Sequence, residues 1–314
     1  MSVPTNTRIP FELQPLWARS ILYQAISFLY RPPALGPGKK EMARVMDYWA
    51  QAVDTLGATD KPPLIPNFAC IQKMCTKRCL QNIGITPPQG EVSPKADPPK
   101  RKNLEEIFPG GPSGGFCFAK SGLIGEFKSL EKELRGITFE TWVEQYEHCF
   151  GHTAHGPVPP YELEYGEEHS HRQPQQLGDI AAFYHAFGLK RNDTVHERVD
   201  HISVECEFMH FLTLKQAYAL QYDGEEKVDI CRQAAYRFFS EHLGRWAPSF
   251  SMRLSKQAKG GLMRVLARFT LTWIMDECLR LGISPGLEDL PIRLVMEPEE
   301  TGCVSCSLKL GVPC

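Results

Sequence analysis

The sequence predicts an all-α fold, organised as a single helical bundle that carries one long insertion. Apolar side chains recur at i, i+3 and i+4 in several long segments, whereas no segment alternates between apolar and polar residues over a comparable length. Glycine follows several of the predicted helix ends, as at positions 188, 224, 244 and 282, which is typical of helix C-termini. With 42% apolar and 23% charged residues, the chain can bury a sizeable core.

Two helices are expected at the start of the chain, over residues 12–30 and 41–57. Arg31-Pro32-Pro33 ends the first and Gly57 ends the second, because proline and glycine do not continue a helix well. Residues 61–115 then hold 10 of the 25 prolines and 6 of the 25 glycines, which indicates an insertion or long loop. The chain is therefore divided into four predicted units: 1–60, 61–115, 116–284 and 285–314.

The third unit, 116–284, contains most of the predicted helices. Two short helical patterns lie between Leu123 and Phe150, and a polar stretch with several prolines and glycines follows over residues 152–174. Strong amphipathic patterns then cover residues 176–187, 201–222, 227–243 and 259–281. The last unit, 285–314, is expected to be an irregular, cysteine-bearing tail.

Charge and hydropathy exclude two classes of function. Lys and Arg number 35 against 37 Asp and Glu, so the chain lacks the basic excess that phosphate contacts to nucleic acid require. No apolar run approaches the roughly 20 residues of a membrane-spanning helix. Residues 1–15 lack the charged-then-apolar layout of a secretion signal. We therefore expect a cytoplasmic protein with no stable membrane insertion.

An acidic stretch beside aromatic residues is the first candidate site. Four glutamates fall within seven residues, at 162, 164, 167 and 168, with no Lys or Arg among them. One interpretation is a solvated acidic loop. The other is a carboxylate-lined mouth beside Tyr161, Tyr165, Phe183, Tyr184 and Phe187. Such a surface suits a partner that is basic at one end and apolar along its length.

Asp200 stands immediately before a predicted helix, and two roles are open for it. At an N-cap position its carboxylate would satisfy backbone N–H groups, which needs no further function. The alternative is a binding residue. Glu205 lies on the same helix face as Met209 and Leu212, so its carboxylate must find a partner or lie at the edge of a groove.

Four segments in this order are characteristic: PPYELEYG, LGDIAAFYHAFGL, ERVDHISVECEFMHFLTLKQA and EHLGRWAPSF. Together with the opening helix they closely resemble the TorD/DmsD/NarJ-type family of cytoplasmic chaperones for molybdoenzymes. The most specific part is the string Glu197, Asp200 and His201. The loop FGHTAHGPVPPYELEYG resembles most the chaperones that serve enzymes of the dimethylsulfide, ethylbenzene, selenate and chlorate type. The chain departs from the family at Arg198, where many members carry proline.

The resemblance implies an all-helical, TorD-like bundle without catalytic activity. It implies a chaperone that binds the apo catalytic subunit of an exported molybdenum oxidoreductase and its twin-arginine leader until the molybdenum cofactor is inserted. This role requires no cofactor of the chaperone's own, and either a monomer or a homodimer is expected. The resemblance assigns partner binding to eight residues: Glu197, Asp200, His201, Tyr161, Glu162, Tyr165, Phe183 and Tyr184. Glu205 is the ninth candidate, from its position on the helix face.

Six of the 11 cysteines form two clusters, Cys70, Cys75 and Cys79 in the insertion and Cys303, Cys306 and Cys314 in the tail. Thiolates two to four residues apart can bind one soft metal, so four of the six could hold an iron–sulfur cluster or zinc. The alternative is a set of free thiols. A competing function is therefore an iron–sulfur or zinc protein for electron transfer or metal delivery on a helical scaffold. The scattered cysteines are expected to be small buried hydrophobes.

Overall fold

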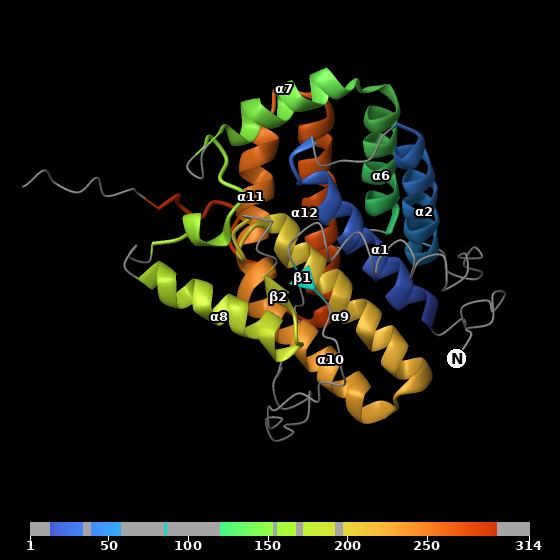
Figure 1. The fold of residues 1–314 in the computed structure, drawn as a ribbon. Helices are drawn as coiled ribbons and strands as arrows, with labels where there is room; N and C mark the ends of the chain where they lie inside the picture. The colour runs from blue at the N-terminus through green and yellow to red at the C-terminus, as the bar shows by residue number, and fades with distance from the viewer. Residues whose placement is uncertain are drawn as a thin grey trace, which may run out of the picture.

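The computed structural model confirms the all-α fold (Figure 1). It describes residues 13–33, 39–57, 85–86, 120–152, 156–167, 172–191 and 197–293. The α-helices are α1 (Gln14–Leu29), α2 (Lys39–Gly57), α6 (Lys120–Gly136), α7 (Phe139–Phe150), α8 (Gln173–Ala186), α9 (Ile202–Tyr222), α10 (Glu225–Phe238), α11 (Gly244–Gln257) and α12 (Gly261–Leu281). A 3-10 turn, η4 (Glu162–Glu164), and a π-helical turn, η6 (Phe239–Leu243), complete the helical elements.

Helices α1, α9 and α12 form the centre of the bundle. Helix α1 packs against α9 and α2, while α12 packs against α11, α6 and α7. Helix α8 lies on one flank and the α2–α6 pair lies on the opposite flank (Figure 1). Two short strands, β1 (Ile85–Thr86) and β2 (Lys190–Arg191), pair antiparallel, with Ile85 opposite Arg191. Among the described residues, no helix combines the length and the apolar character that crossing a membrane requires.

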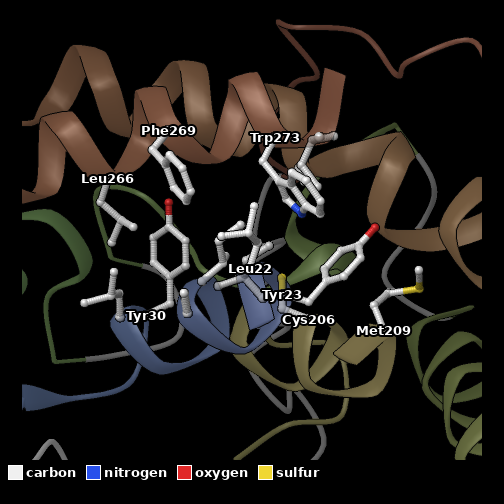
Figure 2. Packing of buried hydrophobic residues seen from close by; sticks show 14 of the residues in the cluster. Leu22, Tyr23, Tyr30, Cys206, Met209, Leu266, Phe269 and Trp273 are labelled. Atoms are coloured by element: carbon white, nitrogen blue, oxygen red, sulfur yellow. The ribbon is translucent and has the colours of Figure 1, made fainter. Parts of the chain in front are cut away.

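The core joins α1 to α12 through large aromatic side chains (Figure 2). The rings of Tyr23 and Trp273 meet edge to face, with their centroids 5.3 Å apart. Tyr23 of α1 and Tyr30, the residue that follows α1, are buried with a hydrogen-bonded hydroxyl: the Tyr23 hydroxyl donates to Glu277 at 2.9 Å, and the Tyr30 hydroxyl lies 3.0 Å from that of Thr270. These contacts allow tyrosine to be fully buried, because an unpaired hydroxyl in an apolar core is costly.

Buried polar pairs also fasten α9 to α1. Glu207 is fully buried, and one of its carboxylate oxygens accepts from the Arg31 guanidinium and the Ser27 hydroxyl, each at 2.9 Å. One turn further along α9, Nδ1 of His210 lies 2.7 Å from the Ser20 hydroxyl. Burial lowers the pKa of His210 and so favours the neutral ring. Because these partners face each other across two helices, they specify one register between α1 and α9.

One helix was not predicted from the sequence. The pattern analysis ended a helix at residue 243, but the chain continues helically through η6 into α11 despite Gly244 and Pro248. Pro248 has no N–H, so the carbonyl of Gly244 loses its usual helical donor. Instead it accepts from the backbone N–H of Gly286, at 2.9 Å. The expectation that Gly244 ends a helix is therefore wrong, because a distant segment satisfies the exposed carbonyl.

The scattered cysteines behave as predicted where the structure describes them. Cys149, Cys206, Cys231 and Cys278 are buried free thiols. Burial raises the pKa of Cys149, Cys231 and Cys278 to about 11, so these thiols stay protonated at neutral pH. Cys117 lies outside the described residues, as do nearly all of the predicted insertion and most of the predicted tail. The four-unit division of the chain stays a prediction.

Candidate peptide-binding groove

A groove of about 680 Å³ lies between α8 and the helical stretch formed by α10 and η6. Its apolar lining comes from two sides: Ile180, Phe183 and Phe187 of the α8 side, and Ile230 and Ala234 of α10. The 3-10 turn η4 contributes to one end. Eight of the 16 lining residues are polar or charged, and both signs of charge are present. Apolar walls combined with polar groups are typical of sites that bind a peptide or a small ligand.

Aromatic packing holds the α8 wall in place. The ring of Phe183 meets that of Phe238 edge to face at 5.4 Å, and it meets the His242 imidazole at 5.5 Å. The Arg237 guanidinium lies over Phe183, 5.6 Å from the ring centroid. On the buried side of α8, Tyr184 packs against Phe238 and donates its hydroxyl to the Val199 carbonyl at 2.8 Å. The wall is therefore fixed to the bundle through both α10 and the segment before α9.

Glu162 provides a carboxylate at the end of this groove. The turn that carries it is anchored on both sides, because Tyr161 forms a β-bridge with His201 and Tyr165 forms one with Ile292. The Glu162 backbone N–H donates to the Asp200 carbonyl at 2.9 Å. Its side chain is only 9% exposed and lies 3.0 Å from Nδ1 of His242.

The π-helical turn η6 determines where His242 points. A π turn contains one more residue than an α turn, so it shifts the direction of the side chains that follow. His242 consequently lines the groove, while Trp246, one turn later, is buried and donates its indole N–H to Glu205 at 3.0 Å. The same turn therefore supplies one group to the groove and one to the polar cluster beneath it.

Glu205 is the centre of that buried cluster. It is fully buried, and its second carboxylate oxygen, Oε1, has no hydrogen-bond partner among the described residues. Burial, followed by the negative charge of Glu162, holds the pKa of Glu205 well above its usual range. From the sequence, Glu205 was expected either to find a partner or to lie at the edge of a groove. It has a partner, the Trp246 indole, and its side chain does not reach the surface.

Arg198 holds two further carboxylates together. Its guanidinium donates to Glu164 at 2.8 Å and to both oxygens of Asp200, at 3.0 and 2.8 Å. It also stacks over the Tyr161 ring, 4.4 Å from the centroid. Asp200 is fully buried, and burial raises its pKa although the Arg198 charge opposes this shift. Arg198 occupies the position where many members of the resembled family carry proline.

Asp200 is not the N-cap of α9. That position belongs to His201, whose Nδ1 accepts from the Ser203 backbone N–H at 3.1 Å. Because this nitrogen is an acceptor, the ring is neutral, and burial lowers the His201 pKa in the same direction. The Asp200 carboxylate instead accepts from the Leu163 N–H at 3.2 Å and from Arg198. The capping prediction was wrong by one residue, because the chain enters the helix through the bridge to Tyr161.

The nine predicted partner-binding residues lie around the groove but not all in it. Glu162 and Phe183 line it. Behind or beside it lie Tyr161, Tyr165, Tyr184, Glu197, Asp200, His201 and Glu205, and of these only Tyr161 and Glu197 are not buried. The Tyr161 hydroxyl donates to Glu197 at 3.1 Å, and the Tyr165 hydroxyl donates to the Pro159 carbonyl at 2.9 Å. A binding role for these residues stays a prediction, and for the buried ones it would be indirect.

The sequence analysis missed the α10 side of the groove. Ala234, Arg237 and His242 lie on a helix that was predicted, but nothing in its apolar spacing shows which helix it faces. Among the described residues, no three His, Cys, Asp or Glu side chains are arranged to hold a metal ion. The two cysteine clusters lie outside the described residues, so the predicted metal site stays a prediction.

Comparison with known proteins confirms the family resemblance. Residues 120–252 match the family described as nitrate reductase delta subunit. The chain is 35% identical over 78 residues to the chlorate reductase assembly chaperone protein of Ideonella dechloratans, covering 25% of this chain and 39% of that protein. It is 37% identical over 94 residues to the perchlorate reductase assembly chaperone protein of Dechloromonas aromatica, covering 29% and 41%.

A more distant relative extends the similarity. The chain is 27% identical over 119 residues to the chaperone protein TorD of Shewanella loihica, covering 37% of this chain and 50% of that protein. The chain thus spans between 39% and 50% of the length of these three relatives.

Proposed function

We propose that this chain, which resembles the TorD/NarJ-type family through residues 120–252, is an assembly chaperone for a molybdenum oxidoreductase. It would act in the cytoplasm by binding the apo catalytic subunit, together with that subunit's twin-arginine leader, until the molybdenum cofactor is in place. The activity is binding rather than catalysis, and it requires no cofactor of the chaperone's own.

The position of the groove carries this proposal. Every residue that lines it falls between Glu162 and Arg245, inside the segment 120–252 that matches the family. The groove lining is therefore part of the family-like region and includes no residue of the predicted insertion or tail.

The chemistry of the groove suits a segment with a basic start and an apolar continuation. The wall from Ile180 to Phe187 can receive apolar side chains of a helix or extended peptide, and aromatic walls contribute strongly to such binding. At the η4 end, the Glu162 carboxylate can receive a guanidinium. Twin-arginine leaders combine these two features, as the family resemblance implies.

Affinity capture with a matched pair of variants tests the proposal. The tagged full chain is purified anaerobically from its own host, and the retained proteins are identified by mass spectrometry. Ala182→Arg places a long charged side chain into the groove from an exposed position of α8, so the fold should tolerate it. Ala43→Arg is the control, because Ala43 is exposed on α2 at the opposite flank of the bundle.

We expect the wild type and Ala43→Arg to retain the catalytic subunit of a molybdenum oxidoreductase in near-equal amounts, and Ala182→Arg to lose it. Absence of such a subunit from the wild-type sample would contradict the chaperone role. Equal retention by all three proteins would leave the role standing but move the binding surface away from the groove.

We also propose that four of the six clustered cysteines bind zinc or an iron–sulfur cluster. Two contacts support this proposal. They attach the described residues nearest to the two cysteine clusters, Ile85 and Arg293, to the two ends of α8. Ile85, six residues after Cys79, pairs with the strand that follows α8, and Arg293, ten residues before Cys303, donates to Gln176 in the first turn of α8. Six and ten residues can span at most about 20 and 35 Å, whereas α8 is only about 21 Å long. The two clusters are therefore within reach of each other.

Metal analysis of the full chain tests this second proposal. Cys303→Ser combined with Cys306→Ser should abolish bound metal, whereas the buried thiol variant Cys231→Ala should keep it. If the variant without metal still retains the client subunit and loses no electron-transfer or metal-delivery activity, the metal is structural. If retention survives but an electron-transfer or metal-delivery activity disappears, the competing function is the correct one. Metal-free wild-type protein would refute the site.

A further inference from the structure

We infer that Arg293 holds the two groove carboxylates Glu162 and Asp179 in position relative to each other, and that this arrangement selects a ligand with a basic end. The inference rests on the proposed peptide-binding function and names a positioning residue for it. Arg293 lies outside the family-matching segment 120–252, so nothing in that match assigns a role to it.

A strap formed by residues 286–293 runs from the junction of η6 and α11 to η4. At its start, the Gly286 N–H donates to the Gly244 carbonyl at 2.9 Å, next in sequence to the groove-lining Arg245. In its middle, the Leu290 carbonyl accepts from the Arg253 guanidinium at 3.2 Å. The strap is therefore attached along α11, the helix that continues the η6 wall of the groove.

At its other end the strap joins η4 to α8. Ile292 forms a β-bridge with Tyr165, and the Arg293 backbone N–H donates to the Glu164 carbonyl at 2.9 Å. The Arg293 guanidinium donates to Oε1 of Gln176, which lines the groove on the α8 side, at 3.2 Å. One residue thus contacts η4 through its backbone and α8 through its side chain.

The N-terminal half of α8, residues 173–179, depends on such side-chain contacts. No residue in this half is buried, and the first buried position of the helix is Ile180. Apolar packing therefore does not fix this half, in contrast to the half that carries Phe183 and Tyr184. The hydrogen bond from Arg293 to Gln176 ties it to the strap instead.

Two of the three carboxylates that line the groove lie on the segments that Arg293 joins. Asp179 lies in the N-terminal half of α8, and Glu162 lies in η4. The third, Glu241, lies on the opposite wall, where its carboxylate accepts from Arg237 at 3.2 Å. A guanidinium of the ligand would therefore find its anions at the η4 end, and their relative position depends on the Arg293 contact.

The position and the charge of Arg293 have opposite effects on a basic ligand, which makes the two roles separable. Its positive charge alone would repel the ligand, so its removal would strengthen binding. Its hydrogen bond holds α8 against η4, so its removal frees Asp179 and leaves the ligand to order this part of the wall, which weakens binding. The groove cations Arg237 and Arg245 lie on the opposite wall and are the same in both cases.

Hydrogen exchange of the full chain, measured by mass spectrometry, tests the attachment without a ligand. Arg293→Ala should raise exchange in residues 173–179 and leave α10 unchanged, because only the contact to α8 is lost. Arg293→Lys keeps the charge and a donor and should restore protection. Arg232→Ala is the control, since it removes an exposed cation of α10 that does not line the groove. Unchanged exchange of residues 173–179 in Arg293→Ala would overturn the inference.

A matched peptide pair tests the selectivity. One synthetic peptide carries two arginines followed by an apolar stretch, and its partner has citrulline in place of both arginines, which removes the charge and keeps the shape. The wild type should prefer the arginine peptide. In Arg293→Ala we expect the arginine peptide to bind about 3- to 10-fold more weakly, the range that one hydrogen bond predicts, and the citrulline peptide to change little. Arg293→Lys and Arg232→Ala should bind both peptides as the wild type does.

A double-mutant cycle tests whether Arg293 acts through Gln176. In a Gln176→Ala background, Arg293→Ala should cause no further loss of affinity for the arginine peptide, because the contact is already absent. A full additional loss in this background would overturn the inference, since Arg293 would then act by another route.

The remaining outcomes separate this inference from the proposed function. Stronger binding of the arginine peptide by Arg293→Ala would overturn the inference, because Arg293 would then act only through its charge. Equal loss of both peptides would also overturn it, as would equal binding of both by the wild type, and in these two cases the peptide-binding groove stands. If the wild type binds neither peptide, the proposed leader-binding role fails and the selectivity inferred for Arg293 fails with it, even where hydrogen exchange shows that Arg293 holds α8.

Discussion

Replacing Arg198 with alanine tests how the segment before α9 is held together. The guanidinium is the cation that lies between Glu164 and Asp200, and its side chain is 29% exposed. After its removal, Asp200 keeps the Leu163 N–H as a donor but remains fully buried without a compensating positive charge. Tyr161 also loses the cation that covers its ring.

The expected cost follows from this burial. Removing one partner of a fully buried ion pair costs roughly 3–5 kcal/mol. Because Arg198 is partly exposed and water can replace some of its contacts, we expect about 2–3 kcal/mol for Arg198→Ala at pH 7. The cost should shrink as the pH falls. Burial already raises the pKa of Asp200, the loss of Arg198 raises it further, and a protonated Asp200 needs no cation.

Urea denaturation at pH 7 and pH 5, followed by circular dichroism, measures this difference. Arg135→Ala provides the control, because Arg135 forms an ion pair with Glu131 on the exposed side of α6 and its loss should change stability little. A loss in Arg198→Ala as small as that of the control would refute the reasoning. So would a loss that stays the same or grows at pH 5.

Three further predictions follow from single contacts. Gly286→Ala should lower the melting temperature and raise hydrogen exchange after α12, because a Cβ at this position would lie 1.8 Å from the Arg245 carbonyl oxygen. The control Gly178→Ala should change neither quantity, because a Cβ there would meet open space. Glu205→Gln should gain stability over the wild type as the pH rises from 6 to 9 in urea titrations, since a carboxyl with a raised pKa stabilises the fold at low pH and loses that contribution on ionisation. Trp246→Phe should cost about 1–3 kcal/mol by the same assay, because Glu205 loses its indole donor; an unchanged unfolding midpoint would contradict that hydrogen bond.

Much of the fold could be predicted because helix signals are local. The predicted helix at 201–222 corresponds to α9 at Ile202–Tyr222, and that at 259–281 corresponds to α12 at Gly261–Leu281. Apolar residues at i, i+3 and i+4 identify a helix whatever it packs against. The same local analysis missed α11, because the Gly244 carbonyl, left without a helical donor by Pro248, accepts from Gly286, which lies 42 residues after Gly244.

The candidate site was predictable only in part, for a related reason. The acidic and aromatic pattern indicated Glu162 and Phe183, and both line the groove. The opposite wall could not be identified, since the spacing of residues within α10 does not encode its contact with α8. Nor could the sequence show that Asp200 is fully buried, because a carboxylate before a helix has the same pattern whether it caps the helix or binds a distant arginine.

The sequence by itself therefore determined the all-α class, most of the helices and the family resemblance, since each depends on residues within one or two helical turns or on the order of short segments. Only the tertiary structure decided that His201 caps α9, that Arg198 joins Glu164 to Asp200, and that Glu205 is buried against Trp246. These features depend on which distant groups meet in a desolvated interior. There, the distance between two charges and their burial control both the protonation and the stability of the site.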